Sequence, residues 1–427
     1  MIKSILKKII PPFLLDFYHL SWAFISAVFY GFPSKGMIVI GITGTNGKST
    51  VVDLTHRILM EAEFRVASLS SIRFQINDNQ QKNRLKMTMP GRFAVQRFIA
   101  NAKEQDCKYV IVETTSEGIK QYRHKFIDYD IAAITNLRPE HIESHGSFEN
   151  YKNAKGELFK ALSGVRKKNI PKISIVNLDD QNADYFLSFK TDQKWGYSLK
   201  EKTAKIDKVI FSSNYQVFPD KTIFHIGQTK FEIKLLGEFN ISNVLAAICI
   251  GLSQNIALQI IKRAIEKTDN IPGRMEQVVS SPFKVFVDYA HTPDALEAVY
   301  KTAKQGSNAL ICVLGSCGGG RDRWKRPEMG RIASNNCQKI ILTNEDPYDE
   351  NPESILDDIQ KGIENKNTQR IIDRRQAINQ ALKIARPGDV VLVTGKGSEP
   401  WMCMPDGQKL AWDDREIVKE ELNKLQI

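Results

Sequence analysis

The sequence has few cysteines and no pattern that would organise them. Six occur among 427 residues, and no two have the two-residue spacing of zinc ribbons or redox centres. This scatter excludes a small disulfide-stapled scaffold and favours free thiols in a reducing compartment. The chain also has no long block of like charges and no GxGxxG dinucleotide fingerprint. The six cysteines are Cys107, Cys249, Cys312, Cys317, Cys337 and Cys403.

The overall composition is that of an ordinary globular protein. Apolar residues make up 42% and charged residues 26%, with 26 glycines and 16 prolines, which excludes a disordered or collagen-like chain. At roughly 100–200 residues per domain, we expect two to four domains. Lys and Arg exceed Asp and Glu by 60 to 49, a net charge of +11. This excess fits nucleic acid, an anionic membrane surface and a polyanionic small substrate equally well.

The first 36 residues differ from the rest. Three lysines, Lys3, Lys7 and Lys8, precede an apolar run from Phe13 to Phe32. Because Asp16 lies inside this run, the clean stretch is shorter than the ~20 residues that a spanning helix needs, and no small-x-small site indicates a signal peptide. An aromatic-rich helix lying in a membrane interface fits better. The alternative is a helix that covers the next domain or pairs with a second subunit.

A phosphate-binding loop follows this segment. Residues 37–42 are an apolar, β-branched run that predicts a buried parallel strand, and apolar residues at helical spacing begin at Val51. Between them, glycines allow backbone N–H groups to surround phosphate oxygens, Lys48 reaches the β- and γ-phosphates, and Ser49 is placed to bind Mg²⁺. Ile42 stands where the first glycine of the usual motif would be. The predicted nucleotide contacts are Gly44, Thr45, Asn46, Gly47, Lys48, Ser49 and Thr50.

The loop Gly44-Thr-Asn-Gly-Lys-Ser49 resembles the ATP loop of the Mur ligase family, the ATP-dependent amide-forming enzymes of cell-wall synthesis. Further motifs of this family recur up to about residue 416, and the later ones resemble its MurE branch. The resemblance implies an α/β fold: a P-loop central domain with a mainly parallel sheet, followed by a Rossmann-like C-terminal ligase domain. The expected divisions are an N-terminal helical segment over 1–36, a central domain over 37–272 and a C-terminal domain over 273–427.

A second set of residues resembles the family's metal site. Glu113 ends an apolar strand, and residues 135–156 resemble the pattern TNLxxDHLDxHG…AAK. The resemblance implies that Glu113 and His141 bind a second Mg²⁺ and that Lys155 is carbamylated, which turns a cation into a carboxylate-like metal ligand. After Glu113 the hydroxyls of Thr115 and Ser116 are kept as expected substrate contacts.

The remaining motifs resemble the nucleotide and substrate contacts of the family. Asn240 and Asn243 stand where the family contacts adenine, although Asn240 or Ser242 could equally be a plain helix N-cap. Arg274 inherits a γ-phosphate contact, and Asp288 and His291 are placed near the nucleotide. The resemblance gives catalytic roles to Lys48, Lys155, Arg274 and His291. It gives substrate contacts to Thr115, Ser116, Arg321, Arg323, Asp346, Tyr348, Lys396, Gly397, Ser398 and Glu399.

The implied reaction is the ATP-dependent addition of a free amino acid to a muropeptide-type carboxylate through an acyl phosphate, with Mg²⁺. We expect this in the cytoplasm or at the inner face of the membrane, without nucleic acid. Only 40 residues precede Gly41, so the family's N-terminal UDP-binding domain is not expected, and the acceptor could be UDP-linked or lipid-linked, with peripheral membrane contact through residues 1–36. Tyr348 replaces the arginine of the diaminopimelate-adding branch, so lysine is as plausible as diaminopimelate.

Two alternatives stay open at this point. One is a folylpolyglutamate synthase-like or other poly-amino-acid ligase on the same scaffold. The other is a membrane-associated P-loop ATPase that is not a ligase, which would have no need of Lys155 or of the motifs at 395–399 and 413–416.

Overall fold

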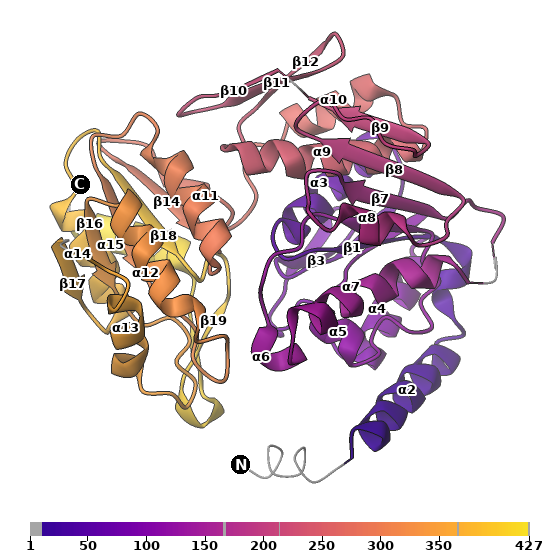
Figure 1. Ribbon diagram of the computed structural model, residues 1–427, viewed down its shortest axis with the longest axis horizontal. Helices are drawn as coiled ribbons and strands as arrows, with labels where there is room; N and C mark the ends of the chain where they lie inside the picture. The colour runs from indigo at the N-terminus through magenta and orange to yellow at the C-terminus, as the bar shows by residue number, and fades with distance from the viewer. Residues whose placement is uncertain (1–10, 165–167, 213, 365–366, 426–427) are drawn as a thin grey trace. The chain divides into compact units, whose positions relative to one another are not determined.

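The computed structural model describes residues 11–164, 168–212, 214–364 and 367–425. Lys3, Lys7 and Lys8 lie outside the described residues. The chain forms two compact units (Figure 1). The first contains residues up to 137, 149–213 and 242–265, and the second contains 138–148, 214–241 and 266–427. The expected division into domains at residues 36 and 272 stays a prediction.

The first unit is built on a nine-stranded sheet in the order β4-β3-β2-β5-β1-β6-β7-β8-β9. Its strands are parallel except for a hairpin, β3 and β4, that extends one edge. The chain leaves β1 to one side for β2 and β5 and returns on the other side for β6, which creates a crevice at the carboxyl ends of these strands. The strands are β1 Ile38–Thr43, β2 Val66–Leu69, β3 Arg73–Ile76, β4 Asn79–Lys82, β5 Tyr109–Glu113, β6 Ile131–Ile134, β7 Ile173–Asn177, β8 Gln193–Ser198 and β9 Lys208–Phe211.

Helices connect these strands. The helix after β1 begins at Lys48, so the phosphate-binding loop leads directly into a helix N-terminus, as predicted. The helices in this part of the chain are α2 Pro12–Phe29, α3 Lys48–Glu61, α4 Arg92–Glu104, α5 Ser116–Lys120, α6 Ile142–His145, α7 Phe148–Leu162, α8 Ala183–Leu187, α9 Glu238–Ser253 and α10 Leu258–Glu266, with a 3-10 turn, η1, at Pro33–Gly36.

The second unit has a six-stranded sheet in the order β13-β14-β18-β15-β16-β17. The four predicted strands lie at its centre and are parallel, which confirms the Rossmann-like arrangement. Two edge strands were not predicted: β13 is antiparallel, and β17 is short and mostly exposed. The strands are β13 Glu276–Val279, β14 Lys284–Asp288, β15 Leu310–Leu314, β16 Lys339–Leu342, β17 Asn367–Arg370 and β18 Val390–Thr394.

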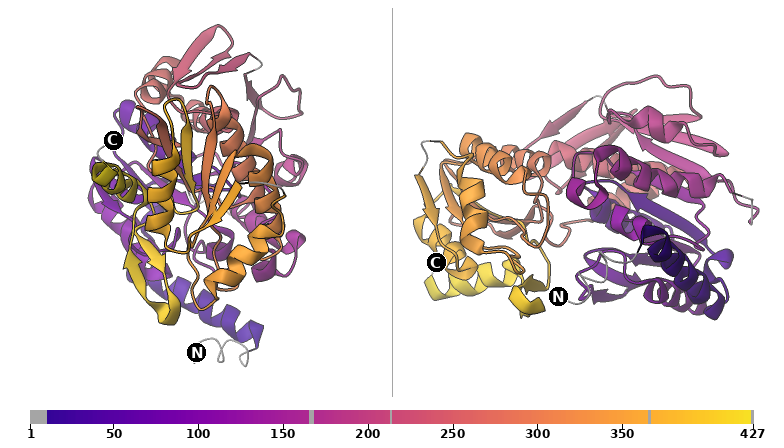
Figure 2. Two further views of the ribbon diagram at one scale, coloured as in Figure 1. Left: turned by 90° about the vertical axis from the view of Figure 1, so that its left-hand side faces the viewer. Right: turned by 60° about the horizontal axis from the view of Figure 1, so that its bottom comes forward.

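Helices pack on both faces of this sheet (Figure 2). Alternate residues of the four central strands contact α11, α12 and α13 on one face and α14 and α15 on the other, the two-sided burial that gives parallel strands their continuous apolar runs. The helices are α11 Pro293–Lys304, α12 Lys325–Asn336, α13 Pro352–Gln360, α14 Arg374–Ile384 and α15 Asp414–Leu425. Smaller elements are β10 Tyr215–Val217, β11 Thr222–Ile226, β12 Thr229–Ile233, β19 Trp401–Cys403, η2 Pro405–Gly407 and β20 Lys409–Ala411.

The prediction that every cysteine is a free thiol is wrong for two of them. Cys312 on β15 and Cys337 after α12 form a disulfide, with their Cα atoms 6.1 Å apart. The helix α12 runs back along β15, and this return brings together two residues that are 25 positions apart. Sequence spacing alone does not show such a contact. The other four cysteines form no disulfide.

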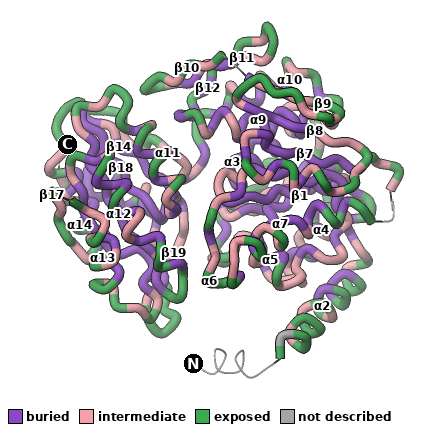
Figure 3. Tube along the Cα trace, in the orientation of Figure 1, coloured by how far each residue is buried: buried purple, intermediate pink, exposed green. Residues whose placement is uncertain are grey.

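The helix α2 carries an unusually apolar exposed surface. Its small residues Ala23, Ser26 and Ala27 are buried, and it contacts α4 through the ring pair Trp22–Phe93. Most of the rest of the helix is exposed (Figure 3). Among the described residues, no helix is long and apolar enough to cross a membrane. The exposed large apolar side chains of α2 are Phe13, Leu14, Phe17, Tyr18, Leu20, Trp22, Phe24, Ile25, Val28 and Phe29.

Candidate active site

The phosphate-binding loop is held in shape by its own unit. Gly47 has φ 82°, in the left-handed region that favours glycine, and directly precedes α3. The Lys48 ammonium donates to the Thr45 carbonyl at 2.8 Å. The residue that follows β6 also holds the loop backbone, because the Thr135 hydroxyl donates to the Asn46 carbonyl at 2.6 Å. The predicted contacts 44–50 therefore lie together as one preformed loop at the carboxyl end of β1.

Ser49 and Glu113 lie within hydrogen-bonding distance of each other. The Ser49 hydroxyl donates to Glu113 Oε2 at 2.9 Å, and both residues are buried. Ser71, which follows β2, adds a backbone N–H at 2.9 Å from the same oxygen. Hydroxyl and carboxylate oxygens are the hard ligands that Mg²⁺ prefers, so these residues fit the ion. Ser71 was not predicted; the signal for it is its place just beyond a strand neighbouring β5.

Lys155 lies on α7 and points at the loop. Its side chain is 1% exposed, and its ammonium donates to the Gly44 carbonyl at 2.7 Å and lies over the Tyr151 ring. Burial lowers the pKa of Lys155, the charge of Lys48 lowers it further, and Glu113 opposes both. Because a carbamate forms from the neutral amine, this environment favours the predicted modification, which stays a prediction.

His141 does not belong to the same compact unit as Glu113 and Lys155. It lies in the 138–148 segment, which belongs to the second unit, whereas Glu113 and Lys155 belong to the first. Its backbone is left-handed, with φ 57°, at the position before α6. Neighbouring residues of this segment contact residues 322–325: Lys325 donates to Glu140 at 2.8 Å, and Asp322 accepts from the Glu143 N–H at 3.0 Å. Within the described residues, no cluster of three or more His, Cys, Asp or Glu could hold a metal ion.

Two predicted contacts have structural partners. The Thr115 hydroxyl accepts from the Gly118 N–H at 3.0 Å and so caps α5, while Ser116 is buried beside it.

The prediction of an N-cap at Asn240 or Ser242 is wrong, because α9 already begins at Glu238. Asn240 instead donates to the Leu236 carbonyl at 2.7 Å.

Asn243 contacts the phosphate-binding loop. A side chain at Gly47 would overlap its amide, so this turn of α9 packs directly on the loop. Asn243 is 7% exposed, and its amide lies beside the glycine that precedes α3. This position suits the predicted nucleotide contact.

In the second unit, three predicted nucleotide contacts gather around Tyr289 at the end of β14. Asp288 is buried and accepts from the Met275 and Ala290 N–H groups, each at 2.6 Å. Burial raises the pKa of Asp288, and the charge of Arg274 opposes this. The Arg274 guanidinium lies over the Tyr289 ring at 4.5 Å, and His291 Nδ1 is 2.8 Å from the Tyr289 carbonyl oxygen. Tyr289 was not predicted as a site residue.

Lys396 links two loops that carry predicted substrate contacts, the loop after β16 with Asp346 and the loop after β18 with Glu399. Its buried ammonium donates to both Asp346 oxygens at 2.8 and 2.9 Å and to Glu399 at 2.7 Å. Glu399 also accepts from the Tyr289 hydroxyl at 3.1 Å. Gly397 and Ser398 lie against the 272–273 turn, where the Ser398 hydroxyl donates to the Pro272 carbonyl at 3.2 Å. Lys396 and Asp346 therefore hold each other and fix both loops.

Tyr348 and Arg321 lie together at the same edge. Arg321 hydrogen-bonds the Tyr348 side chain, and burial raises the pKa of that phenol. The Tyr348 ring covers Gly319, where any side chain would overlap the ring, so glycine at this position makes room for the tyrosine. Arg323 is exposed and pairs with Glu350 at 3.0 Å.

A buried carboxylate that sequence reasoning missed lies beneath these residues. Glu345 is 1% exposed, and one of its oxygens accepts from the Cys317 thiol at 2.9 Å. Burial raises the pKa of Glu345, and the charge of Asp346 raises it further. The signal for both residues is their place just beyond the carboxyl ends of two adjacent strands, β16 and β15.

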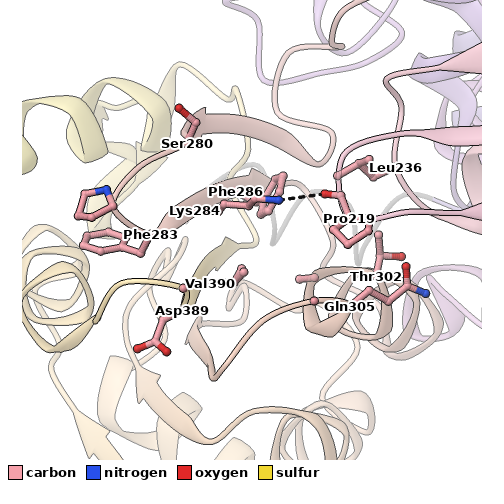
Figure 4. Close-up of a pocket in the computed structure, with 14 residues that line it drawn as sticks. Pro219, Leu236, Ser280, Phe283, Lys284, Phe286, Thr302, Gln305, Asp389 and Val390 are labelled. Carbon is pink, nitrogen blue, oxygen red and sulfur yellow. Dashed lines mark hydrogen bonds between the residues drawn. The ribbon is translucent and has the colours of Figure 1, made fainter.

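A surface pocket of the second unit lies at the amino-terminal ends of the strands in its sheet (Figure 4). Lys284 and Val390, the first residues of β14 and β18, line it, whereas the predicted contacts lie at or after the last residues of these strands. Lys284 donates across it to the Pro219 carbonyl at 3.2 Å. This pocket is therefore separate from the candidate active site.

Comparisons with known proteins agree with this arrangement. A family model described as the Mur ligase middle domain matches residues 42–251, and one described as the Mur ligase, glutamate ligase domain matches residues 273–397. The chain is 35% identical, over 94% of its length and 81% of the relative's, to UDP-N-acetylmuramoyl-L-alanyl-D-glutamate--2,6-diaminopimelate ligase of Syntrophomonas wolfei. It is also 35% identical, over 94% of its length and 81% of the relative's, to UDP-N-acetylmuramyl-tripeptide synthetase 2 of Oceanobacillus iheyensis.

Solved structures show the same relationship. A structure of UDP-N-acetylmuramoyl-L-alanyl-D-glutamate--2,6-diaminopimelate ligase is 31% identical, covers 92% of this chain and 79% of its own, and has a TM-score of 0.61. Folylpolyglutamate synthase of Mycobacterium tuberculosis reaches a TM-score of 0.71 over 92% and 94% of the two chains, but at 16% identity it shows a shared fold alone. With its phosphate-binding loop, its ligase-domain sheet and these relatives, the chain belongs to the Mur ligase family of ATP-dependent ligases.

Proposed function

We propose that this enzyme adds a free amino acid to the carboxylate of a muropeptide in peptidoglycan synthesis. The observation that carries this proposal is the buried Lys155 amine, which donates to the Gly44 carbonyl of the phosphate-binding loop and feels the charge of Glu113. An ATPase that is not a ligase has no use for such a lysine. The MurE-type relatives support the muropeptide acceptor.

The reaction proceeds in two steps. An oxygen of the acceptor carboxylate attacks the γ-phosphorus of ATP, ADP leaves, and an acyl phosphate forms. The neutral amine of the incoming amino acid then attacks the acyl carbon, the C–O bond to phosphate breaks, and the amine proton is released. Lys48 and Arg274 stabilise the charge that spreads over the transferring phosphoryl group. No side chain needs to act as a nucleophile.

Bound Mg²⁺ would supply charge neutralisation at the β- and γ-phosphate oxygens. Ser49 is the residue that would hold one ion. Glu113 and His141, together with a carbamate on Lys155, would hold a second. The Gly44 carbonyl and the Tyr151 ring keep the Lys155 amine in place and away from water.

The test is ADP formation with panels of acceptors and amino acids. We expect ATP turnover only when a muropeptide acceptor and an amino acid are both present. Turnover with a folate acceptor instead would place the enzyme with the folylpolyglutamate synthases, and turnover with neither substrate would identify an ATPase.

We also propose that the enzyme acts in the cytoplasm, at the inner face of the membrane, and that its acceptor is UDP-linked or lipid-linked. The exposed apolar surface of α2, with Phe17 70% and Phe29 72% exposed, supports peripheral membrane contact. Flotation with liposomes tests it, for the full chain and for a chain that starts at Ser34. If only the full chain floats, the contact stands; if neither floats, it does not exist.

A further inference from the structure

Two segments of the second unit that carry predicted ligand contacts pack directly on each other. The 272–274 turn ends at Arg274, the predicted γ-phosphate contact, and the 395–399 loop ends at Glu399, a predicted substrate contact. Any side chain at the glycine of the turn would overlap the backbone of the loop, and the Ser398 hydroxyl donates to a carbonyl of the turn at 3.2 Å. Because the two backbones are in close contact, a shift of one segment moves the other.

Tyr289 contacts both segments. Its backbone N–H donates to the Gly273 carbonyl at 3.0 Å, and its ring lies against the Arg274 guanidinium, 4.5 Å from the ring centre. Its hydroxyl donates to Glu399 at 3.1 Å. Burial raises the pKa of Tyr289, and the charge of Glu399 raises it further, so the phenol keeps the proton that it donates. One side chain thus joins a cation expected at the phosphate to a carboxylate expected at a substrate.

The charge around Glu399 suits an amine. The Glu399 side chain is 21% exposed, and Lys396 links it to Asp346. The buried carboxylate of Glu345 is close enough to Asp346 for each charge to oppose the other. Three carboxylates therefore lie around the Lys396 ammonium, and this excess of negative charge attracts a cationic amine and repels a phosphate. The incoming amino acid supplies such an amine.

We propose that Tyr289 is a positioning residue that couples binding of the amino acid at Glu399 to the placement of Arg274 for phosphoryl transfer. This inference rests on the function proposed above. An ammonium that binds Glu399 orders this carboxylate, and the hydrogen bond from Tyr289 then orders the ring against which Arg274 lies. The acyl phosphate therefore forms mainly when the amine that consumes it is present, which limits its loss to water.

The experiment measures ADP formation in a single turnover by rapid quench, with ATP and UDP-N-acetylmuramoyl-L-alanyl-D-glutamate, with and without saturating lysine. In the wild type, lysine should accelerate this first step about tenfold or more. Tyr289→Phe keeps the ring and loses only the hydroxyl, so the acceleration should fall below about twofold, as expected for the loss of one hydrogen bond to a charged group. The KM for lysine should change less than about threefold, because Lys396 still holds Glu399. A residue that only binds the amino acid would change KM instead.

Three further variants separate this role from packing. Tyr215→Phe is the matched control, since it removes another tyrosine hydroxyl that donates to a glutamate, Glu238, at 2.8 Å, and it should keep the full acceleration. Ser398→Ala removes the other link between the loop and the turn and should also weaken the acceleration, so the test does not depend on one variant. Tyr289→Leu removes the ring as well and should slow the first step both with and without lysine.

Amide formation by the wild type is followed in the same samples. If the wild type forms amide but lysine accelerates the first step less than about twofold, the coupling is absent and the ligase function stands. The same holds if Tyr289→Phe responds to lysine as the wild type does. If the wild type forms no amide, the proposed function fails, and the coupling fails with it.

Discussion

Lys155 shows how a single side chain can change its chemistry by its position. A solvent-exposed lysine is a cation, but here the amine is buried against the Gly44 carbonyl with another cation, Lys48, close enough to lower its pKa. An amine that is more often neutral reacts more readily with carbon dioxide. The sequence could point to this lysine only through its offset from His141, because burial is a property of the folded chain.

Substituting Lys155 tests this role. Lys155→Ala should reduce turnover about a hundredfold or more, as expected when a group that organises charge at the reacting phosphate is lost. Added short carboxylates or high bicarbonate should partly restore activity to the variant or protect the wild type. Lys160→Ala, one turn further along the same helix and exposed, is the control. Normal turnover of the Lys155 variant would refute the assignment.

The buried pair of Arg374 and Asp414 makes a second residue-level prediction. Both side chains are 0% exposed and meet at 2.7 Å, so Arg374 is not available to hold a substrate carboxylate. Arg374→Ala should lower the free energy of unfolding by about 3–5 kcal/mol, because it leaves a buried charge without a partner. Its neighbour Arg375 pairs at the surface, so Arg375→Ala should cost about 0–1 kcal/mol. Urea denaturation measures both, and equal losses would contradict the account.

Amino-acid choice follows from Tyr348. An arginine at this position would bind a second carboxylate through two charged hydrogen bonds worth about 1.5–3 kcal/mol. Since Tyr348 cannot do this and Arg374 is already paired, we expect no strong preference for meso-diaminopimelate over lysine. A competition assay with both amino acids decides it. A preference of about a hundredfold for diaminopimelate would show that another cation, such as Arg321, binds that carboxylate.

At the scale of elements, the sequence predicted the central strands well and the edges poorly. Three central strands, β1, β5 and β14, are buried on both faces, and their sequences are continuous apolar runs. β1 leads into the phosphate-binding loop, β5 ends at Glu113 and β14 ends at Asp288. The strand β17 is Asn367–Arg370, a polar and mostly exposed segment with no such run. Contacts between elements could not be predicted from the sequence either, as the disulfide between β15 and the residue after α12 shows.

Counting the reactive thiols tests whether the disulfide between Cys312 and Cys337 is present. Alkylation of the denatured protein without reductant should modify the four free thiols and leave Cys312 and Cys337 unmodified. Replacing both with serine should lower the free energy of unfolding by about 3 kcal/mol, as expected for a closed loop of this length. Reduction of the wild type should give a similar loss. Modification of all six cysteines before reduction would show that the bond is absent.

At the scale of the whole molecule, two units each place their polar residues at or just beyond the carboxyl ends of parallel strands. In the first unit these are the phosphate-binding loop, Ser71 and Glu113, and in the second they are Asp288, Glu345 and Lys396. Both sheets thus follow the general rule for ligand sites in open α/β folds. The family resemblance predicted most of these positions, whereas Ser71, Tyr289 and Glu345 needed the structure.

The central claim is that the acceptor carboxylate is activated as an acyl phosphate. The most direct measurement starts with a muropeptide whose reacting carboxylate carries ¹⁸O at both oxygens, together with ATP and the amino acid. The account predicts that each inorganic phosphate released contains one ¹⁸O atom, because the carboxylate oxygen leaves with the phosphate when the amine attacks the acyl carbon. Phosphate free of ¹⁸O, released while the amide forms, would contradict the acyl-phosphate mechanism, and phosphate released without any amide would contradict the ligase function itself.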